Sequence, residues 1–248
     1  MNGAIPPPET AGTVDVAEKD GIAVLALRRE KKLNALSTHL EQALLDALRT
    51  SEVTGSRAVV ITGTDRVFSA GADTGELKEM TPPAIAEYYR GSGAVYEEVA
   101  ALRQPVVAAI AGYCLGGGLE LALAADLRVA DETAVFGLPE VGLGILPSSG
   151  GVTRLVREIG PGRTRDLVLR GRRFGPAEAH AWGLLTEVVP PGSHLSRALQ
   201  IAGELAGQPP LAVEIAKQVI GTAGDTSREA SLLLERLAYA ALNRTGTT

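Results

Sequence analysis

The chain has 248 residues, of which 45% are hydrophobic and 21% are charged, and its formal net charge is -5 at pH 7. This composition is typical of one soluble globular domain, and it excludes a strongly basic nucleic-acid-binding protein and a disordered chain. A single cysteine and three well-separated histidines leave no disulfide framework and no Cys/His metal site, so we expect no bound metal and a reducing, cytoplasmic setting.

The first residues, MNGAIPPPETAG, lack the basic and apolar segments of a signal peptide, so we predict a flexible arm over residues 1–11. The apolar run from Pro105 to Ala125 approaches the length of a transmembrane helix. It is interrupted by Gly112, by three further glycines and by Glu120, which would be costly in lipid. Buried core of a globular protein is the better interpretation, and we expect no membrane association.

Residues 13–29 form two alternating apolar segments around Lys19-Asp20-Gly21, which predicts a β-hairpin with Asp-Gly in its turn. Behind Ser37, a candidate N-cap, apolar residues recur at helical spacing as far as Glu52. The segment therefore predicts a hairpin followed by an amphipathic helix.

Two short β-branched runs, RAVVITG at residues 57–63 and PVVAAIAG at residues 105–112, each end in glycine and lead into helical patterns. This alternation predicts an α/β fold with a mostly parallel sheet that is covered on both faces. From Gly151 onward the pattern is mainly helical, and LLTEVVP, at residues 184–190, is the one strand-like segment in it. We therefore predict a sheet-rich first part followed by a helical tail.

The stretch CLGGGLELALAAD, residues 114–126, places three glycines at the start of a predicted helix whose only charge before Asp126 is Glu120. Glycine inside a helix costs about 1 kcal/mol relative to alanine, so the stretch must need a bare backbone. Two explanations are open. The helix start packs closely against a neighbouring strand, or the free N–H of Gly117 faces a ligand oxygen on which negative charge develops.

A second group of small residues, Ala70-Gly71-Ala72-Asp73, follows the first predicted parallel strand. By itself it indicates either an ordinary loop with an Asp cap or a backbone that a ligand can approach closely.

Two carboxylates stand in otherwise uncharged stretches: Glu120, and Glu140 between Pro139 and a glycine-rich loop. Burial raises the pKa of an isolated carboxyl, which suits general acid–base catalysis, and two such groups could hold and split a water molecule. The alternative for Glu120 is a solvated helix edge, where it would pair with Arg128 or Arg154.

Three segments together closely resemble the enoyl-CoA hydratase/isomerase, or crotonase, superfamily: REKKLNALS, RVFSAGADTGEL and the block from Pro105 to Leu155. The similarity extends from about Gly12 to about Asn243 and depends on the order and spacing of the motifs. It implies a crotonase-like spiral of β-β-α units that forms two nearly perpendicular sheets over residues 12–192. A helical trimerisation region follows at 193–248, shorter than in many relatives, and the implied assembly is a homotrimer or a dimer of trimers.

The resemblance also implies roles for individual residues. The backbone amides of Ala72 and Gly117 would form an oxyanion hole for the carbonyl of an acyl-CoA thioester, and Glu120 and Glu140 would hold the catalytic water. Contacts with the substrate and its CoA moiety are implied for Lys32, Leu33, Ala35, Ser69, Ala70, Asp73 and Gly116.

The presence of both glutamates favours an enoyl-CoA hydratase, which adds water to a trans-2-enoyl-CoA thioester to give a 3-hydroxyacyl-CoA, a reaction of fatty-acid β-oxidation. No cofactor is implied beyond the coenzyme A of the substrate. The alternatives are an enoyl-CoA isomerase or another crotonase-type enzyme, and a catalytically silent acyl-CoA-binding protein. Ser148 and Ser149 stand where many hydratases have smaller residues, so we expect them to reshape the acyl pocket.

Overall fold

The protein is described by a computed structural model that covers residues 11–91 and 94–244. The predicted arm at residues 1–11 lies outside this part, apart from Ala11. Within the described part, no helix combines the length and the apolar sequence needed to cross a lipid bilayer.

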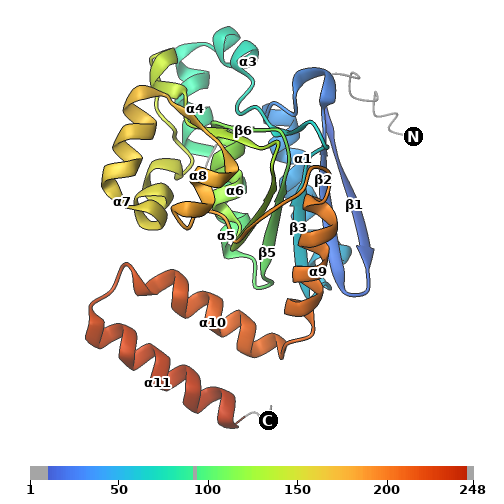
Figure 1. The fold of residues 1–248 in the computed structure, drawn as a ribbon, viewed down its shortest axis with the longest axis vertical. Coiled ribbons are helices and arrows are strands. Elements are labelled where there is room, and N and C mark those ends of the chain that lie inside the picture. Colours follow the sequence, from blue (N-terminus) through green and yellow to red (C-terminus); the bar gives the residue numbers. More distant parts are fainter. Residues whose placement is uncertain (1–10, 92–93, 245–248) are drawn as a thin grey trace.

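A six-stranded sheet forms the centre of the molecule (Figure 1). All neighbouring strands are parallel except the first two, which form the predicted hairpin, and Asp20 and Gly21 in its turn have φ values of 56° and 78°. Two successive positive φ angles match the right-handed twist of the flanking strands. In spatial order the strands are β1 (Thr13–Lys19), β2 (Ile22–Arg28), β3 (Ala58–Thr62), β5 (Val106–Ile110), β7 (Leu127–Asp131) and β10 (Glu187–Val189).

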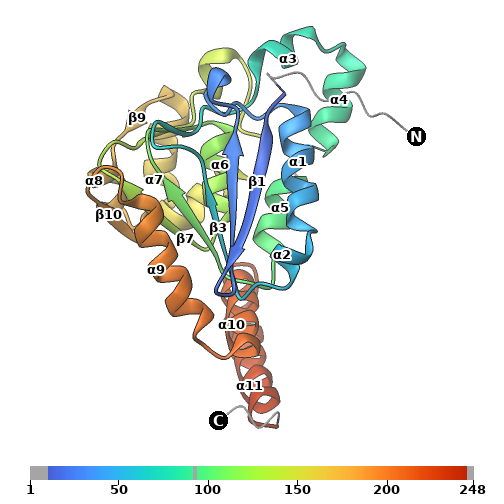
Figure 2. The same cartoon turned by 90° about the vertical axis from the view of Figure 1, so that its right-hand side faces the viewer.

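Both faces of the central strands β3 and β5 are buried, as their continuous apolar runs predict, whereas the edge strand β1 has no buried residue. In β3, Val59 and Ile61 face one hydrophobic cluster, whereas Ala58 and Val60 face another. The first cluster is covered by α1 (Thr38–Leu48), α5 (Ala94–Ala101) and α6 (Gly117–Ala124), and the second by α9 (His194–Ala206) (Figure 2). The predicted N-cap of α1 is confirmed, since Ser37 Oγ accepts the N–H of Leu40 at 3.2 Å.

A smaller sheet lies beside the large one and creates the spiral. Its strands are β4 (Val67–Ser69), β6 (Tyr113–Leu115), β8 (Val135–Gly137) and β9 (Arg173–Phe174). The chain passes from β3 to β4, from β5 to β6 and from β7 to β8, and helices follow each pair, so the predicted β-β-α spiral is confirmed.

The sequence pattern missed β9, which makes the prediction of a single strand after Gly151 wrong. This strand has only two residues and depends on a tertiary contact, because the ring of Phe174 packs against that of Phe136 with centroids 5.5 Å apart. Periodicity cannot detect so short an element.

The remaining helices connect and extend these layers. They are η1 (Glu30–Lys32), α2 (Ser51–Thr54), α3 (Thr74–Glu79), α4 (Pro82–Gly91), η2 (Glu140–Leu143), α7 (Gly151–Arg170), α8 (Pro176–Ala181), α10 (Pro210–Ala223) and α11 (Arg228–Arg244).

The predicted helical tail divides into two parts. Helix α9 packs on the sheet, whereas α10 and α11 lie side by side and project from the body (Figures 1 and 2). The projecting extension therefore consists of α10 and α11 and begins after α9. Lys217 of α10 ties the extension to the body, since its Nζ lies 2.8 Å from Asp126 and donates to the carbonyl of Gln104.

Candidate active site

The glycine triplet at the start of α6 serves two purposes at once. A Cβ on Gly118 would lie 2.4 Å from the carbonyl oxygen of Ser69, so this position requires glycine for close packing against β4. Gly116 has a φ of 52°, which favours glycine, and turns the chain into the helix. Gly117 then begins the helix with its N–H free of the intrahelical ladder. Both explanations therefore apply, to different glycines: close packing at Gly118 and a free donor at Gly117.

The loop that follows β4 supplies a second free donor. Leu36 pairs with Ala72 as in a parallel sheet: the N–H of Leu36 donates to Gly71, and the N–H of Asp73 donates to Leu36. In this pattern the N–H of Ala72 points to the opposite side. Within the described residues, neither this N–H nor that of Gly117 donates to a protein atom. A Cβ on Gly117 would lie 3.5 Å from Ala72 N, so the two donors border the same space.

A partly buried ion pair holds this loop in place. Arg29 lies 2.8 Å from Asp73, and it also donates to the carbonyl of Ala35 at 2.9 Å. The other oxygen of Asp73 caps α3 by accepting the N–H groups of Gly75 and Glu76. The backbone of Ala72 is therefore held by charge-assisted contacts on the residue that follows it.

Glu120 is buried at 3% exposure and is held by backbone amides. Its Oε1 accepts the N–H of Ser149 at 2.8 Å and that of Gly151 at 2.9 Å. The alternative of a solvated helix edge with an arginine partner is therefore wrong: Arg128 pairs with Glu158, and Arg154 pairs with Glu97. Burial raises the pKa of Glu120, while the two amides and the nearby Arg154 lower it.

Glu140 begins η2 and is poorly solvated. Its Oε1 lies over Gly116, since a Cβ there would come within 2.9 Å of it, and its buried Oε2 has no hydrogen-bond partner among the described residues. Burial raises the pKa of Glu140 to about 7, and the negative charge of Glu120 adds to this increase.

These groups meet in one small cavity of about 30 Å³. The structure brings both predicted glutamates and both predicted donors to its wall. The lining residues are Ala72, Leu77, Tyr88, Tyr96, Gly117, Glu120, Glu140, Ile145, Leu146, Pro147, Ser148 and Ser149.

The two segments predicted to contact CoA lie against each other. The N–H of Ala70 donates to the carbonyl of Leu33 at 3.0 Å, which joins the loop after β4 to the end of η1. Lys32 and Leu33 are exposed there, Leu33 at 44% with a left-handed backbone, and the carbonyl of Ala35 is bound by Arg29. This surface is available to a ligand.

Three predicted ligand residues have internal roles instead. Ser69 is fully buried, and its hydroxyl donates to Asn34 O at 2.8 Å and accepts the N–H of Gly71, so its assignment as a ligand contact needs correction. The carboxylate of Asp73 is bound by Arg29 and by α3, and Gly116 lies beneath Glu140. These three residues therefore support the site through contacts within the protein.

Sequence analysis missed several residues that build the site. The amides of Ser149 and Gly151 hold Glu120, and Glu41 and Tyr96 form a buried pair behind the cavity. The members of each pair of partners are between 29 and 55 positions apart in the chain. No local spacing signals such contacts.

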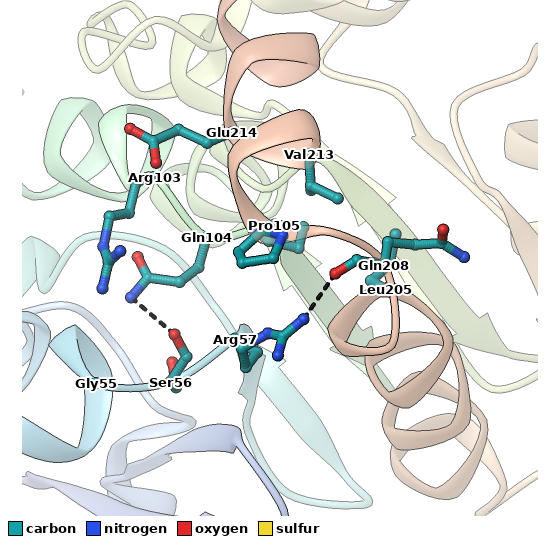
Figure 3. Close-up of a pocket in the computed structure, with 11 residues that line it drawn as sticks. Gly55, Ser56, Arg57, Arg103, Gln104, Pro105, Leu205, Gln208, Val213 and Glu214 are labelled. Carbon is teal, nitrogen blue, oxygen red and sulfur yellow. Dashed lines mark hydrogen bonds between the residues drawn. The ribbon is translucent and has the colours of Figure 1, made fainter. Parts of the chain in front are cut away.

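A second cavity, of about 140 Å³, lies where α9 leads into α10 (Figure 3). Arg57 donates to the carbonyl of Gln208 at 2.7 Å, and the Gln104 amide donates to that of Ser56 at 3.3 Å. Arg103 likewise donates to a carbonyl, that of Thr54. Of these contacts, the one from Arg57 joins the start of the extension to the body, and the other two lie within the body. Among the described residues, the one carboxylate in the lining of this cavity is Glu214.

The raised pKa of Glu140 predicts a pH-dependent stability effect of Glu140→Gln. A carboxyl whose pKa rises from 4.5 in the unfolded chain to about 7 in the folded protein contributes stability below pH 4.5 that is lost as the pH rises through 7. Glutamine does not ionise, so at pH 8 the variant should be more stable than the wild type by on the order of 2 kcal/mol. Denaturant unfolding at pH 5 and pH 8 measures this. An advantage that does not grow with pH would contradict the assigned environment.

Comparison with known proteins agrees with this site. Residues 17–244 match the family model for enoyl-CoA hydratase/isomerase. The chain is 37% identical to the 2,3-dehydroadipyl-CoA hydratase of Escherichia coli over 93% of its own length and 90% of the relative, and 36% identical to a probable enoyl-CoA hydratase of Mycobacterium bovis over 92% and 88%. The crystal structure of an enoyl-CoA hydratase from Bacillus anthracis matches with a TM-score of 0.90 at 36% identity, covering 94% of this chain and 92% of that one. The chain is therefore an enzyme of the enoyl-CoA hydratase/isomerase family, the crotonase superfamily.

Proposed function

We propose that the protein is an enoyl-CoA hydratase that adds water to the C2–C3 double bond of a trans-2-enoyl-CoA thioester. One observation carries the proposal: two buried carboxyls, Glu120 and Glu140, share a cavity with two unused backbone donors, Ala72 and Gly117. The names of the relatives, which include hydratases, support the same reaction. Coenzyme A enters as part of the substrate, and the proposal includes no other cofactor and no metal.

The backbone donors would act on the thioester carbonyl. As water adds to C3, electron density moves through the conjugated system onto the carbonyl oxygen, and the N–H groups of Ala72 and Gly117 would stabilise it there. A preorganised donor of this kind contributes about 3 kcal/mol at the transition state. Both amides are fixed by local structure, one by the Leu36 pairing and one by α6, so little reorganisation is needed.

The two glutamates would divide the proton transfers. Glu120 accepts two backbone N–H bonds, which favour its ionised form, so it would orient and deprotonate the water that adds to C3. Glu140 has an unpartnered oxygen and a pKa of about 7, so near neutral pH a substantial fraction would be protonated and able to deliver a proton to C2. The environments thus support an acid and a base in one cavity.

The decisive measurement is the absorbance of the conjugated enoyl-thioester in the presence of enzyme and crotonyl-CoA. Hydration removes the conjugation, and the absorbance should fall to an equilibrium value. A parallel assay with a 3-enoyl-CoA separates hydration from isomerisation by its products. Binding of the thioesters with no turnover on either substrate would overturn the proposal in favour of a silent acyl-CoA-binding protein.

We also propose that the protein assembles as a homotrimer or a dimer of trimers through α10 and α11. Neither helix contains a buried residue, and large apolar side chains are exposed on both. Such surfaces normally face a partner. They include Leu211, Ile220, Leu233, Leu234, Leu237 and Tyr239, and Ile220 and Tyr239 are exposed at 75% and 73%.

The double variant Leu233→Glu/Leu237→Glu is expected to shift the assembly to monomers. The two residues are one helical turn apart in α11 and are exposed at 56% and 58%, so two carboxylates there would be buried uncompensated in an interface. Sedimentation at micromolar concentration measures the mass, with Glu235→Gln on the same helix as control. A wild type that sediments as a monomer would contradict this assembly.

The free thiol of Cys114 is buried, which is compatible with the proposed reducing, cytoplasmic setting. A role in fatty-acid β-oxidation would follow if the substrate is an enoyl-CoA derived from a fatty acid.

A further inference from the structure

A third buried carboxyl lies behind the candidate active site and takes no part in the proposed hydration. Glu41 of α1 is 7% exposed. Its Oε1 accepts the hydroxyl of Tyr96 from α5 at 3.2 Å, and the hydroxyl of Tyr88 from α4 lies at the longer distance of 3.5 Å. Tyr96 is itself 2% exposed. A glutamate facing the core of an amphipathic helix is costly unless its hydrogen bonds are used.

The Tyr96 hydroxyl stands at the oxyanion hole. A Cβ on Gly117 would lie 3.0 Å from the Tyr96 hydroxyl and 3.5 Å from Ala72 N. Tyr88 and Tyr96 line the same cavity as the two catalytic glutamates, whereas Leu77, Ile145 and Leu146 give it apolar walls. An acyl group whose carbonyl occupies the oxyanion hole would therefore have a phenol hydroxyl beside it.

We infer that Tyr96, held by Glu41, is a specificity-determining residue that favours acyl groups carrying an uncharged hydroxyl over plain alkyl groups of the same length. The inference rests on the proposed function, because it names the class of acyl-CoA that the same site accepts.

The donor and acceptor groups explain the preference. Burial and the neighbouring Glu41 raise the pKa of the Tyr96 phenol, so it keeps its proton and donates to Glu41. Its oxygen lone pairs remain to accept a hydrogen bond from a ligand hydroxyl. An alkyl group cannot donate a hydrogen bond to this oxygen. A site that hydrogen-bonds a ligand hydroxyl discriminates against an analogue without that hydroxyl.

A carboxylate on the acyl group should be rejected. It would enter a cavity bordered by Glu120 and Glu140 and backed by Glu41, and Arg154, which faces Glu120, already pairs with Glu97. Like charges in a poorly solvated site repel strongly. The expected order of affinity is therefore hydroxyl first, alkyl second and carboxylate last.

Saturated thioesters test this order without interference from turnover. Calorimetry would give dissociation constants for 4-hydroxybutyryl-CoA, butyryl-CoA and succinyl-CoA with the wild type, with Tyr96→Phe and with Tyr88→Phe. The wild type should bind the hydroxy compound about tenfold more tightly than butyryl-CoA, the fold-change expected of one good hydrogen bond. Tyr96→Phe should bring this ratio close to one, whereas Tyr88→Phe should retain it.

A structural role alone would weaken binding of all three compounds together, so the ratio separates the two interpretations. The inference is overturned if the Tyr96→Phe ratio equals that of the wild type, or if Tyr88→Phe abolishes the ratio instead. The ratio of kcat/KM for 4-hydroxycrotonyl-CoA and crotonyl-CoA should change in the same direction. A wild type that hydrates crotonyl-CoA without any hydroxyl preference refutes the inference alone, whereas a wild type that binds none of the thioesters refutes the proposed function.

Discussion

Replacement of Glu140 by glutamine is expected to lower the rate of crotonyl-CoA hydration by about a hundred- to ten-thousand-fold, the usual contribution of a positioned general acid or base. Glutamine preserves the size of the side chain but cannot donate a carboxylic proton to C2. Its amide still fits above Gly116, where Glu140 Oε1 now lies. Binding of butyryl-CoA should therefore be unchanged, and kcat should fall much more than KM.

The loss of absorbance at the enoyl-thioester band measures the rate, and calorimetry with butyryl-CoA measures binding. Glu132→Gln serves as a matched control, because Glu132 is exposed. Glu120→Gln should reduce hydration as severely, since that carboxylate is the proposed base. Turnover of the Glu140→Gln variant at the wild-type rate would remove Glu140 from the mechanism.

The second large effect is expected from alanine at Gly117. The new methyl group would lie 3.0 Å from the Tyr96 hydroxyl and 3.5 Å from Ala72 N, and the end of a phenol can move by the few tenths of an ångström required. The protein should fold, but the methyl group would crowd the space reserved for the thioester oxygen. Loss of an oxyanion contact reduces kcat by about a hundred- to a thousandfold, and we expect an effect of this size.

Two further glycine substitutions separate the effect on activity from the effect on stability. Gly118→Ala would place a methyl group 2.4 Å from the backbone oxygen of Ser69, which cannot move without the strand, so we expect a loss of stability of about 3 kcal/mol. Gly162→Ala meets no atom within 4 Å and should be neutral or slightly stabilising. Thermal unfolding and crotonyl-CoA hydration of the three variants would test this assignment. Wild-type activity in Gly117→Ala would contradict the oxyanion role.

Much of the architecture follows from local sequence. The Asp20-Gly21 turn, the Ser37 cap and the buried parallel strands β3 and β5 were all predictable, because turn geometry, capping and continuous apolar runs depend on residues close together in the chain. The crotonase resemblance added the pairing of motifs far apart in the chain, and with it the neighbourhood of Ala72, Gly117, Glu120 and Glu140.

Other features exist only after the chain has folded. Whether the Glu120 carboxylate would pair with an arginine or accept two backbone N–H groups depended on the position of the loop before α7. Ser69 proved to be a buried support and not a ligand contact. The strand β9 and the pair of Glu41 with Tyr96 likewise depend on partners far away in the chain.

The sequence by itself therefore determined most of the elements, the family and the chemical identity of the groups available for catalysis, because local geometry and motif spacing carry that information. Only the tertiary structure decided which amides remain free, which carboxyl is held by amide donors and which is left unpartnered, and which phenol borders the acyl cavity. Solvation and hydrogen bonding set the protonation of a carboxyl, and both are properties of its three-dimensional surroundings.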